Sequence, residues 1–443
     1  MSEINNGSRI SNLVELRREL AELNVVDIAA EIEEMEARDM VIAFRILPKD
    51  KAADVFAYLS ADTQRHIIES IDEREIYAII NELYMDDTID FIEEMPANVV
   101  RRVLANTTPE RRKLINTLLQ YPEDSAGSIM TVEYVTLKSD MTVSAAFSQI
   151  RATGTDKETI YTCYVIDNAR KLIGQVTAKT LFLSGKNKLI SEVMDPNVIS
   201  ARTHDDREGL TNKFRVYGFL AMPVVDNENR LVGIVTFDDA LLVQEEEATE
   251  DFEKMAGVSP SEKPYLSTSV FALSRNRVPW LLLLNVSVFI TGAVVQKYED
   301  LLAVLPVLAT FIPMLMDTSG DAGSQSSTLI IRGMAVGDIK SSDVLSVLWK
   351  ESRVSLVCGG CLALVNFARV MIFNHGFGLA LVSSIALMAA TVMAKIMGAM
   401  LPLGARLIKI DPAVMAGPIL TTIVDATSLM LYFSLCVMIL RIH

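Results

Sequence analysis

The chain has 443 residues, of which 50% are hydrophobic and 22% are charged, and its formal net charge at pH 7 is −15. Counted along the sequence, the residues before Val278 carry about −16 and the remainder about +1, so an acidic part precedes an apolar one. This balance argues against nucleic-acid binding, which needs clustered Lys and Arg, and four cysteines are too few for a disulfide framework in a chain of this length.

The first 126 residues are predicted to form a helical cytosolic domain. Residues 1–30 lack the apolar run of a cleaved signal peptide. Over residues 10–120 apolar side chains recur at helical spacing, and turn signals such as Leu47-Pro48 interrupt them every ten to fifteen residues. We expect a superhelical stack of short helices here rather than a catalytic domain. One of these helices carries an acidic face, a pattern that is usually solvated: Asp86, Asp87, Asp90, Glu93 and Glu94.

From Ser128 the pattern changes to alternating strands and helices, and this pattern occurs twice. Tyr164-Val165-Ile166-Asp167 with the following Leu172-Ile173-Gly174 is echoed by Pro223-Val224-Val225-Asp226 with the following Leu231-Val232-Gly233. The repeat resembles a tandem of CBS domains, which are α/β units, over residues 127–190 and 191–245. Such a pair implies regulation by a bound ligand, often an adenine nucleotide, and not catalysis.

An acidic run follows the second repeat. Residues 237–251 contain seven acids in fifteen positions, and their mutual repulsion would be relieved by bound divalent cations. The alternative is a solvated charged helix. Because the run leads directly toward the first apolar segment, we predict a connecting (plug) helix over residues 246–275.

The remainder, residues 276–443, is predicted to be an all-α transmembrane domain. Its apolar segments are long enough to cross a hydrocarbon core of about 30 Å, and we expect five transmembrane helices in contact with lipid. Basic residues flank these segments in a pattern that predicts a cytoplasmic N-terminal part and puts His443 outside. An odd number of helices encloses little space, so a homodimer is the simpler hypothesis. The segments are 278–296, 301–318, about 345–373, 377–402 and 413–440.

Asp425 lies well inside the last segment, beside the hydroxyl residues at 421, 422, 427 and 428. An Asp at the centre of a membrane helix costs on the order of 2.5 to 3.5 kcal/mol, so it needs a partner or a function. One interpretation pairs it with Lys395 or Arg369 of a neighbouring helix. The other makes it a cation site in a pore.

Two more acids are possible pore-mouth residues. Asp411 precedes Pro412, the usual signal for a helix start, and we favour this capping role over ion handling. Asp321 lies in the polar, glycine-broken stretch 317–328. Such a stretch either lines a cavity at membrane depth or forms a simple cytoplasmic loop.

Across nearly its whole length the chain resembles the MgtE family of magnesium channels and transporters. The motifs that carry the resemblance include Glu247-Ala248-Thr249-Glu250-Asp251, Pro279-Trp280-Leu281-Leu282 and the block from Asp411-Pro412 through Gly417-Pro418 to Tyr432-Phe433-Ser434-Leu435. The resemblance implies Mg²⁺ uptake across the plasma (inner) membrane through a dimeric pore, in which Asp425 holds hydrated Mg²⁺. It also implies that cytosolic Mg²⁺ closes this pore.

The family's regulatory Mg²⁺ lies between the N domain, the CBS domains and the connecting helix, and ATP binding to the CBS domains is a further implied possibility. The positions that carry over as sensor ligands are Asp54, Asp86, Asp90, Asp206, Glu208, Asp239, Glu247, Glu250 and Asp251.

The sequence also departs from the family pattern. Asp321 stands in Gly320-Asp321-Ala322-Gly323, where the family usually shows Gly-Asn-x-Gly, and Gly218 and Leu242 replace acids often found among the sensor ligands. Two alternatives stay open: a channel for other divalent cations such as Co²⁺ or Mn²⁺, and a membrane-tethered CBS sensor that conducts nothing. Because the four histidines are scattered and no hydrolase or nucleotide-loop motif is present, we do not expect an enzyme.

Overall fold

A computed structural model describes residues 13–261, 265–266, 268–373 and 376–440. Contacts divide the chain into two compact units, residues 1–244 and 245–443, and each is described here by itself.

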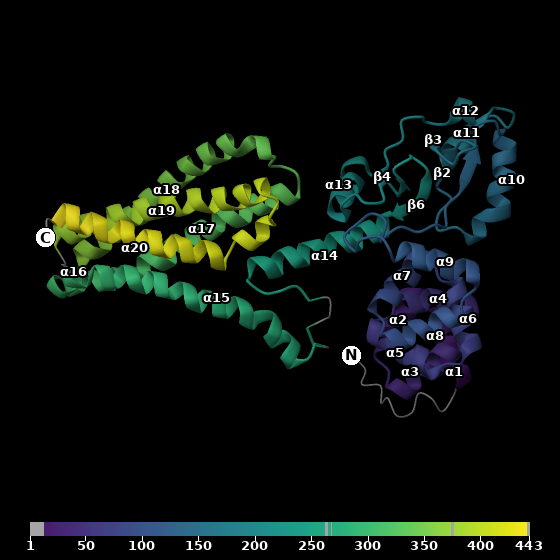
Figure 1. The fold of residues 1–443 in the computed structure, drawn as a ribbon, viewed down its shortest axis with the longest axis horizontal. Helices are drawn as coiled ribbons and strands as arrows, with labels where there is room; N and C mark the ends of the chain where they lie inside the picture. Colours follow the sequence, from purple (N-terminus) through teal and green to yellow (C-terminus); the bar gives the residue numbers. More distant parts are fainter. Residues whose placement is uncertain (1–12, 262–264, 267, 374–375, 441–443) are drawn as a thin grey trace. The chain divides into compact units, whose positions relative to one another are not determined.

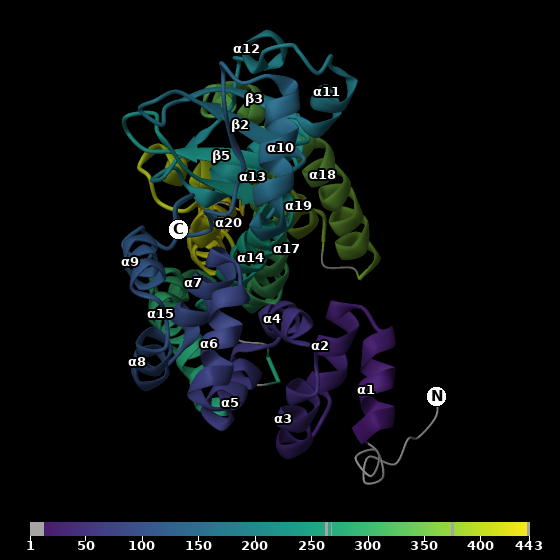
Figure 2. The same cartoon turned by 90° about the vertical axis from the view of Figure 1, so that its right-hand side faces the viewer.

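The first unit begins with a stack of short helices, as predicted (Figures 1 and 2). Each helix has nine or ten residues, which is too short to be stable alone, so the apolar faces are buried against neighbours. In the sixth helix, for example, Asp72 forms a capping box with Glu75, and Ile76, Ile79 and Ile80 are buried. The helices are α1 (Leu13–Glu22), α2 (Val25–Glu33), α3 (Ala37–Arg45), α4 (Lys49–Ala57), α5 (Ala61–Ser70), α6 (Glu73–Glu82), α7 (Met85–Glu94), α8 (Ala97–Ala105) and α9 (Pro109–Leu118).

The predicted repeat forms two similar three-stranded sheets. In each sheet the first two strands are parallel and the second and third are antiparallel. The first repeat contains β1 (Thr136–Lys138), α10 (Val143–Thr153), β2 (Thr162–Ile166), β3 (Leu172–Thr177) and α11 (Ala178–Leu183). The second contains α12 (Ile190–Val193), β4 (Ala201–Arg202), α13 (Arg207–Tyr217), β5 (Ala221–Val225) and β6 (Leu231–Thr236).

The echoed glycines, Gly174 and Gly233, each pack against a methionine of the other repeat. Thr131 pairs with Ile234 of β6 and Asp195 pairs with Gln175 of β3, so a residue near the start of each repeat joins the sheet of the other. A Cβ on Gly174 would lie 2.7 Å from the sulfur of Met194, and a Cβ on Gly233 would lie 2.6 Å from the sulfur of Met130. Glycine is therefore required at both positions.

The connecting helix differs from the prediction. A single helix, α14 (Phe237–Met255), starts directly after β6 and ends at residue 255, so it does not span 246–275. Gly257, with φ of +68°, and Pro260 follow its end and cannot continue a helix. Its residues up to 244 belong to the first unit and the rest to the second, so its acids are divided between the two units.

The second unit is helical throughout its ordered elements, with α19 packed against α17, α18 and α20 (Figure 1). Among the described residues, four spans are long and apolar enough to cross a membrane, judged by length and composition: Val270–Lys297, Val344–Ile372, Phe377–Leu407 and Pro412–Leu440. The helices are α15 (Val270–Lys297), α16 (Glu299–Val304), α17 (Ile312–Ala335), α18 (Val344–Ile372), α19 (Phe377–Leu407) and α20 (Pro418–Leu440).

The predicted second span, 301–318, is wrong as a single helix. It is divided into α16, a 3₁₀ segment (Pro306–Phe311) and the start of α17. The stretch 317–328 is neither glycine-broken nor a loop, because it lies inside the continuous helix α17. Its glycines serve packing instead: a Cβ on Gly398 of α19 would lie 2.2 Å from the carbonyl oxygen of Gly323. With α17 as the remaining span, five transmembrane helices stay a prediction.

The last helix also starts later than predicted. Residues Pro412–Met415 form a 3₁₀ turn capped by Asp411, and α20 begins at Pro418 rather than at 413. Between them Gly417 has φ of +49°, a conformation that suits glycine and ends the turn.

Candidate cation sites

Asp425 is half-buried on α20, where the backbone of α17 comes close to it. A Cβ on Gly320 would lie 3.9 Å from Asp425 Oδ1, so the missing side chain leaves the carboxylate beside the helix backbone. The hydroxyls predicted to accompany it are occupied elsewhere. Thr421, Thr422 and Thr427 donate to carbonyls of their own helix, and Ser428 donates to Ser319 Oγ of α17 at 3.0 Å.

The neighbouring face of α17 is polar and exposed. Asp317, Asp321, Gln325 and Thr328 recur every three or four residues and form what we call the polar stripe. Asp317 and Asp321 flank Gly320, where a Cβ would lie 3.9 Å from Asp425 Oδ1, so the stripe runs beside the Asp425 carboxylate. The residues of α17 that lie between those of the stripe, including Gly320, Gly323 and Ser327, are buried. Acids facing lipid are costly, so the stripe is expected to face water or protein.

The alternative interpretation, in which Asp425 pairs with Lys395 or Arg369, does not fit the contacts of either cation. Lys395 Nζ donates instead to Ala322 O and Gln325 Oε1, both at 3.4 Å. Arg369 donates to Asn366 Oδ1 at 2.9 Å and lies 5.9 Å from the ring centre of Phe311. Within the described part of the chain, neither cation bridges to the Asp425 carboxylate.

A second group of acids lies in the first unit. This group contains Asp86 and Asp87 of α7 and acids distant in the sequence. The negative charges of these acids act on one another, and we call the group the acid cluster. Asp86 is buried, at 7% exposure, so the expectation of a solvated helix face fails for this residue, although Asp90, Glu93 and Glu94 are exposed. The cluster consists of Asp54, Asp86, Asp87, Glu133, Glu158, Asp238 and Asp239.

These carboxylates raise one another's pKa values. Burial raises the pKa of Asp86 well above its usual range, and the charge of Asp239 raises it further. Burial and then Asp239 raise the pKa of Asp87 to about 7 and that of Glu158 to about 8. The cluster is therefore held together against repulsion, which a bound cation would relieve.

The donor set of the cluster suits a hydrated divalent cation. Glu158 Oε2 is buried and has no hydrogen-bond partner among the described residues. In that same part of the chain, no three His, Cys, Asp or Glu side chains are close enough to hold a metal ion directly. Mg²⁺ usually keeps several waters and takes one or two carboxylates from a protein, and carboxylate oxygens are what this cluster offers. The nearby Arg111 points elsewhere, donating to Leu83 O and Thr88 Oγ1.

Sequence reasoning found part of this cluster. Asp54, Asp86 and Asp239 were predicted as sensor ligands, whereas Glu133, Glu158 and Asp238 were missed. No local signal marks Glu133 or Glu158, because each precedes a strand and meets its neighbours through tertiary packing alone.

Asp206 lies apart from the cluster. Its side chain caps α13 by accepting from Gly209 N at 3.1 Å, and Glu208 follows it in the first turn of the helix. Asp206 also lines a pocket of about 550 Å³ with Glu93, Tyr121, Glu123 and His204.

A third site lies at the end of α14, within the second unit. Lys254 Nζ donates to Asp411 Oδ2 at 2.6 Å and forms an ion pair with Glu250 at 2.5 Å. Burial would lower the pKa of Lys254, but the hydrogen bonds to Asp411 and Glu250 outweigh it and raise this pKa. Burial and then the charge of Asp411 raise the pKa of Asp251. The other oxygen of Asp411 accepts from Ala413 N, so the predicted cap is confirmed.

Backbone contacts reinforce this junction between α14 and the turn before α20. A Cβ on Gly417 would lie 2.2 Å from Met255 O, and one on Gly257 would lie 2.6 Å from the ring of Pro418. Glu247 is half-buried two turns earlier on α14. The end of α14 is thus joined to the turn that leads into the helix carrying Asp425.

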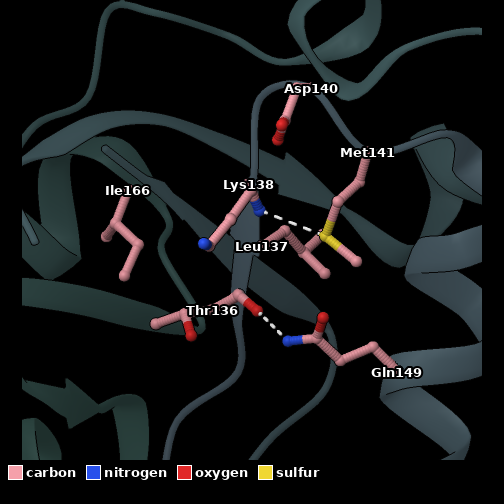
Figure 3. Close-up of a pocket in the computed structure, with 7 residues that line it drawn as sticks. All are labelled: Thr136, Leu137, Lys138, Asp140, Met141, Gln149 and Ile166. Carbon is pink, nitrogen blue, oxygen red and sulfur yellow. Dashed lines mark hydrogen bonds between the residues drawn. The ribbon is translucent and has the colours of Figure 1, made fainter. Parts of the chain in front are cut away.

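A small pocket of about 350 Å³ opens in the first sheet repeat (Figure 3). It lies where the parallel strands β1 and β2 end, and Lys138, Asp140 and Gln149 supply its polar lining. Gln149 Nε2 donates to Thr136 O at 2.7 Å, as Figure 3 shows. The carboxyl ends of parallel strands are common places for ligands in α/β folds.

Comparison with known proteins agrees with this organisation. Residues 312–435 match a family of divalent cation transporters, residues 23–124 match the MgtE intracellular N domain, and residues 126–184 and 190–246 match CBS domains. The magnesium transporter MgtE of Thermus thermophilus is 34% identical over 430 residues, covering 96% of this chain and 95% of the relative. The magnesium transporter MgtE of Bacillus subtilis is 29% identical over 422 residues, covering 92% and 93%.

Among solved structures, the cytosolic domain of the Mg²⁺ channel MgtE in complex with ATP is similar, with a TM-score of 0.51 and 34% identity. The similarity covers 53% of this chain and 95% of that chain. The soluble part of a magnesium transporter matches equally well, with a TM-score of 0.51 and 27% identity over 53% of this chain and 93% of that chain.

An intracellular helical domain, a CBS pair and apolar helices that carry acids together define a divalent-cation transporter of the membrane. The chain belongs to the MgtE family of magnesium transporters, and it moves Mg²⁺ across a membrane. The predicted family, the multi-domain fold class and Mg²⁺ transport are therefore confirmed. The family consists of transporters and is not an enzyme class.

Proposed function

We propose that two copies of the chain form a Mg²⁺ channel whose pore runs between Asp425 and the polar stripe of α17. The observation that carries this proposal is the stripe itself, because its exposed acids Asp317 and Asp321 flank Gly320, the residue of α17 that lies beside Asp425. A second copy placed against the stripe would enclose these acids and keep them from lipid. Carboxylates from two subunits suit an ion that keeps most of its waters.

We further propose that cytosolic Mg²⁺ closes the channel. At low Mg²⁺ the acids within the cluster repel one another, as do the acids along α14, and the first unit loosens. Mg²⁺ bound to these carboxylates offsets the repulsion and favours the closed state. The effect on the pore is limited by the difference in Mg²⁺ affinity between the two states. The regulatory ligands in this proposal are the predicted set together with Asp87, Glu133, Glu158 and Asp238.

Nucleotide binding to the CBS pair is part of the same proposal. A similar solved structure, the cytosolic domain of a family member, is in complex with ATP. In this chain the pocket beside Lys138 and Gln149 offers room for part of a small polar ligand. Titration of the purified protein with ATP, followed by its thermal stability, tests this point, and an unchanged melting temperature at millimolar ATP would count against it.

For membrane orientation, we propose that the first unit lies in the cytoplasm and residue 443 outside the cell, in the plasma membrane. The support is the excess of Lys and Arg around Arg275, between α17 and α18, and after α19.

The test is Mg²⁺ flux into proteoliposomes that hold the purified chain. Asp425→Ala should abolish flux, whereas Asp338→Asn, an exposed acid of the same unit outside the proposed pore, should not. Addition of Mg²⁺ on the cytoplasmic side should suppress flux in the parent. Flux that persists in Asp425→Ala would refute the pore assignment, and no flux of any cation would favour the tethered sensor. Co²⁺ or Mn²⁺ flux exceeding that of Mg²⁺ would favour the other divalent channel.

A further inference from the structure

Lys395 is a buried cation in the middle of α19. Its exposure is 5%, and it lies near the centre of the apolar span Phe377–Leu407. Among the described residues, no carboxylate oxygen lies within ion-pair distance of its ammonium, which instead meets Ala322 O and Gln325 Oε1 at 3.4 Å. A buried charge without a partner of opposite sign is costly in a membrane segment and is normally kept for a function.

The position of the ammonium relates it to the polar stripe. Gln325 belongs to the stripe and follows Asp321 by one helical turn, and Asp321 follows Asp317 by another. Helices α17 and α19 lie close together here because Gly323 of α17 has no side chain. A Cβ on Gly323 would lie 3.2 Å from the carbonyl oxygen of Ala394, the residue before Lys395 on α19. Lys395 therefore reaches the stripe from the protein side, behind the acids.

We propose that Lys395 sets how tightly the pore holds Mg²⁺. This inference rests on the proposed role of the stripe as a pore wall. Asp317, Asp321 and Asp425 attract a passing cation, and the fixed ammonium opposes them. Because the interaction scales with ion charge, the opposition acts on Mg²⁺ twice as strongly as on a monovalent cation. Conduction requires that a site bind an ion tightly enough to admit it and weakly enough to release it. The charge of Lys395 weakens the binding, so that Mg²⁺ is released.

Lys395→Met is the informative substitution. Methionine has a similar length and is apolar, and no described carboxylate loses an ion-pair partner, so the variant removes charge without creating an unpaired acid. We expect the external Mg²⁺ concentration for half-maximal flux to fall on the order of tenfold, and the maximal flux to fall as release slows. Lys395→Arg keeps the charge and should behave like the parent.

The experiment measures Mg²⁺ flux into proteoliposomes over a range of external Mg²⁺. Arg369→Met is the matched control, because this cation is also on a membrane helix but contacts Asn366 rather than the stripe. Adding Asp321→Asn to Lys395→Met should return the half-maximal concentration toward that of the parent. An unchanged half-maximal concentration in Lys395→Met, or a fall in maximal flux alone that Lys395→Arg shares, would overturn the inference. The pore assignment is tested separately, because flux that persists in Asp425→Ala would refute it.

Discussion

The ion pairs of Lys254 give the most specific prediction about regulation. One ammonium joins Glu250 of α14 to Asp411 of the turn before α20, at 2.5 and 2.6 Å, and its side chain is 21% exposed. Lys254→Met removes this bridge and leaves Glu250, Asp251 and Asp411 to repel one another. We expect the end of α14 to leave the turn more easily and the channel to open more readily.

The size of the effect follows from the geometry. A hydrogen bond to a charged group contributes about 1.5–3 kcal/mol, and partial exposure of both carboxylates, 34% each, reduces this to about 1–2 kcal/mol for the docked state. Since 1.4 kcal/mol is a factor of ten, docking should weaken about 5- to 30-fold. If docking favours closure, the cytoplasmic Mg²⁺ concentration that halves flux should rise by up to that factor.

The assay is flux in proteoliposomes at graded cytoplasmic Mg²⁺. Lys254→Arg keeps the positive charge between Glu250 and Asp411 and should retain much of the parent response. Lys350→Met, an exposed lysine of the same unit, is the control and should leave the response unchanged. An unchanged half-inhibiting concentration in Lys254→Met, or an equal rise in Lys254→Arg, would refute the reasoning.

Three further predictions concern stability and docking. Asp87 and Glu158 have folded pKa values of about 7 and about 8, above their usual values of 3.8 and 4.5. Between the usual and the folded pKa values, the native state therefore binds more protons than the unfolded state. The free energy of unfolding in EDTA should fall as pH rises from about 4 to 8. Thermal melts of the full chain should show this fall in stability, and Mg²⁺ should offset it at pH 8. The double variant Asp87→Asn with Glu158→Gln should show a smaller dependence of melting temperature on pH. Glu19→Gln on α1 should leave the dependence unchanged. Gly233→Ala should cost about 1–3 kcal/mol by forcing Met130 away, with partial recovery when Met130→Ala is added, as judged by melting temperature. Gly417→Ala places a Cβ against Met255 O and strains a positive φ, so its flux should resemble that of Lys254→Met; a parent-like response would contradict the docking role of this junction.

The repeated and periodic parts of the fold were predictable because their signals are local. The echo of Gly174 by Gly233, with Met194 and Met130 at matching places, reports a pairwise packing that occurs twice. The long apolar spans can be recognised from their length and composition. Asp425 stood out because a carboxylate inside an apolar segment needs an explanation wherever it packs.

Tertiary structure decided which charges meet. Lys254 and Asp411 are 157 positions apart, and no pattern in either segment indicates their pairing. The acid cluster combines residues from α4, α7, two loops before strands and the start of α14, so its membership depends on how the first unit folds. Residues 317–328 have the composition of a loop, yet they are helical because α19 and α20 cover their small side chains and leave the acids on one outward face. Sequence alone determined most of the apolar segments and the one conspicuous acid, since hydrophobicity is a local property of the chain. The break at Pro306–Phe311 and the electrostatic partners were set by packing between segments far apart in the chain.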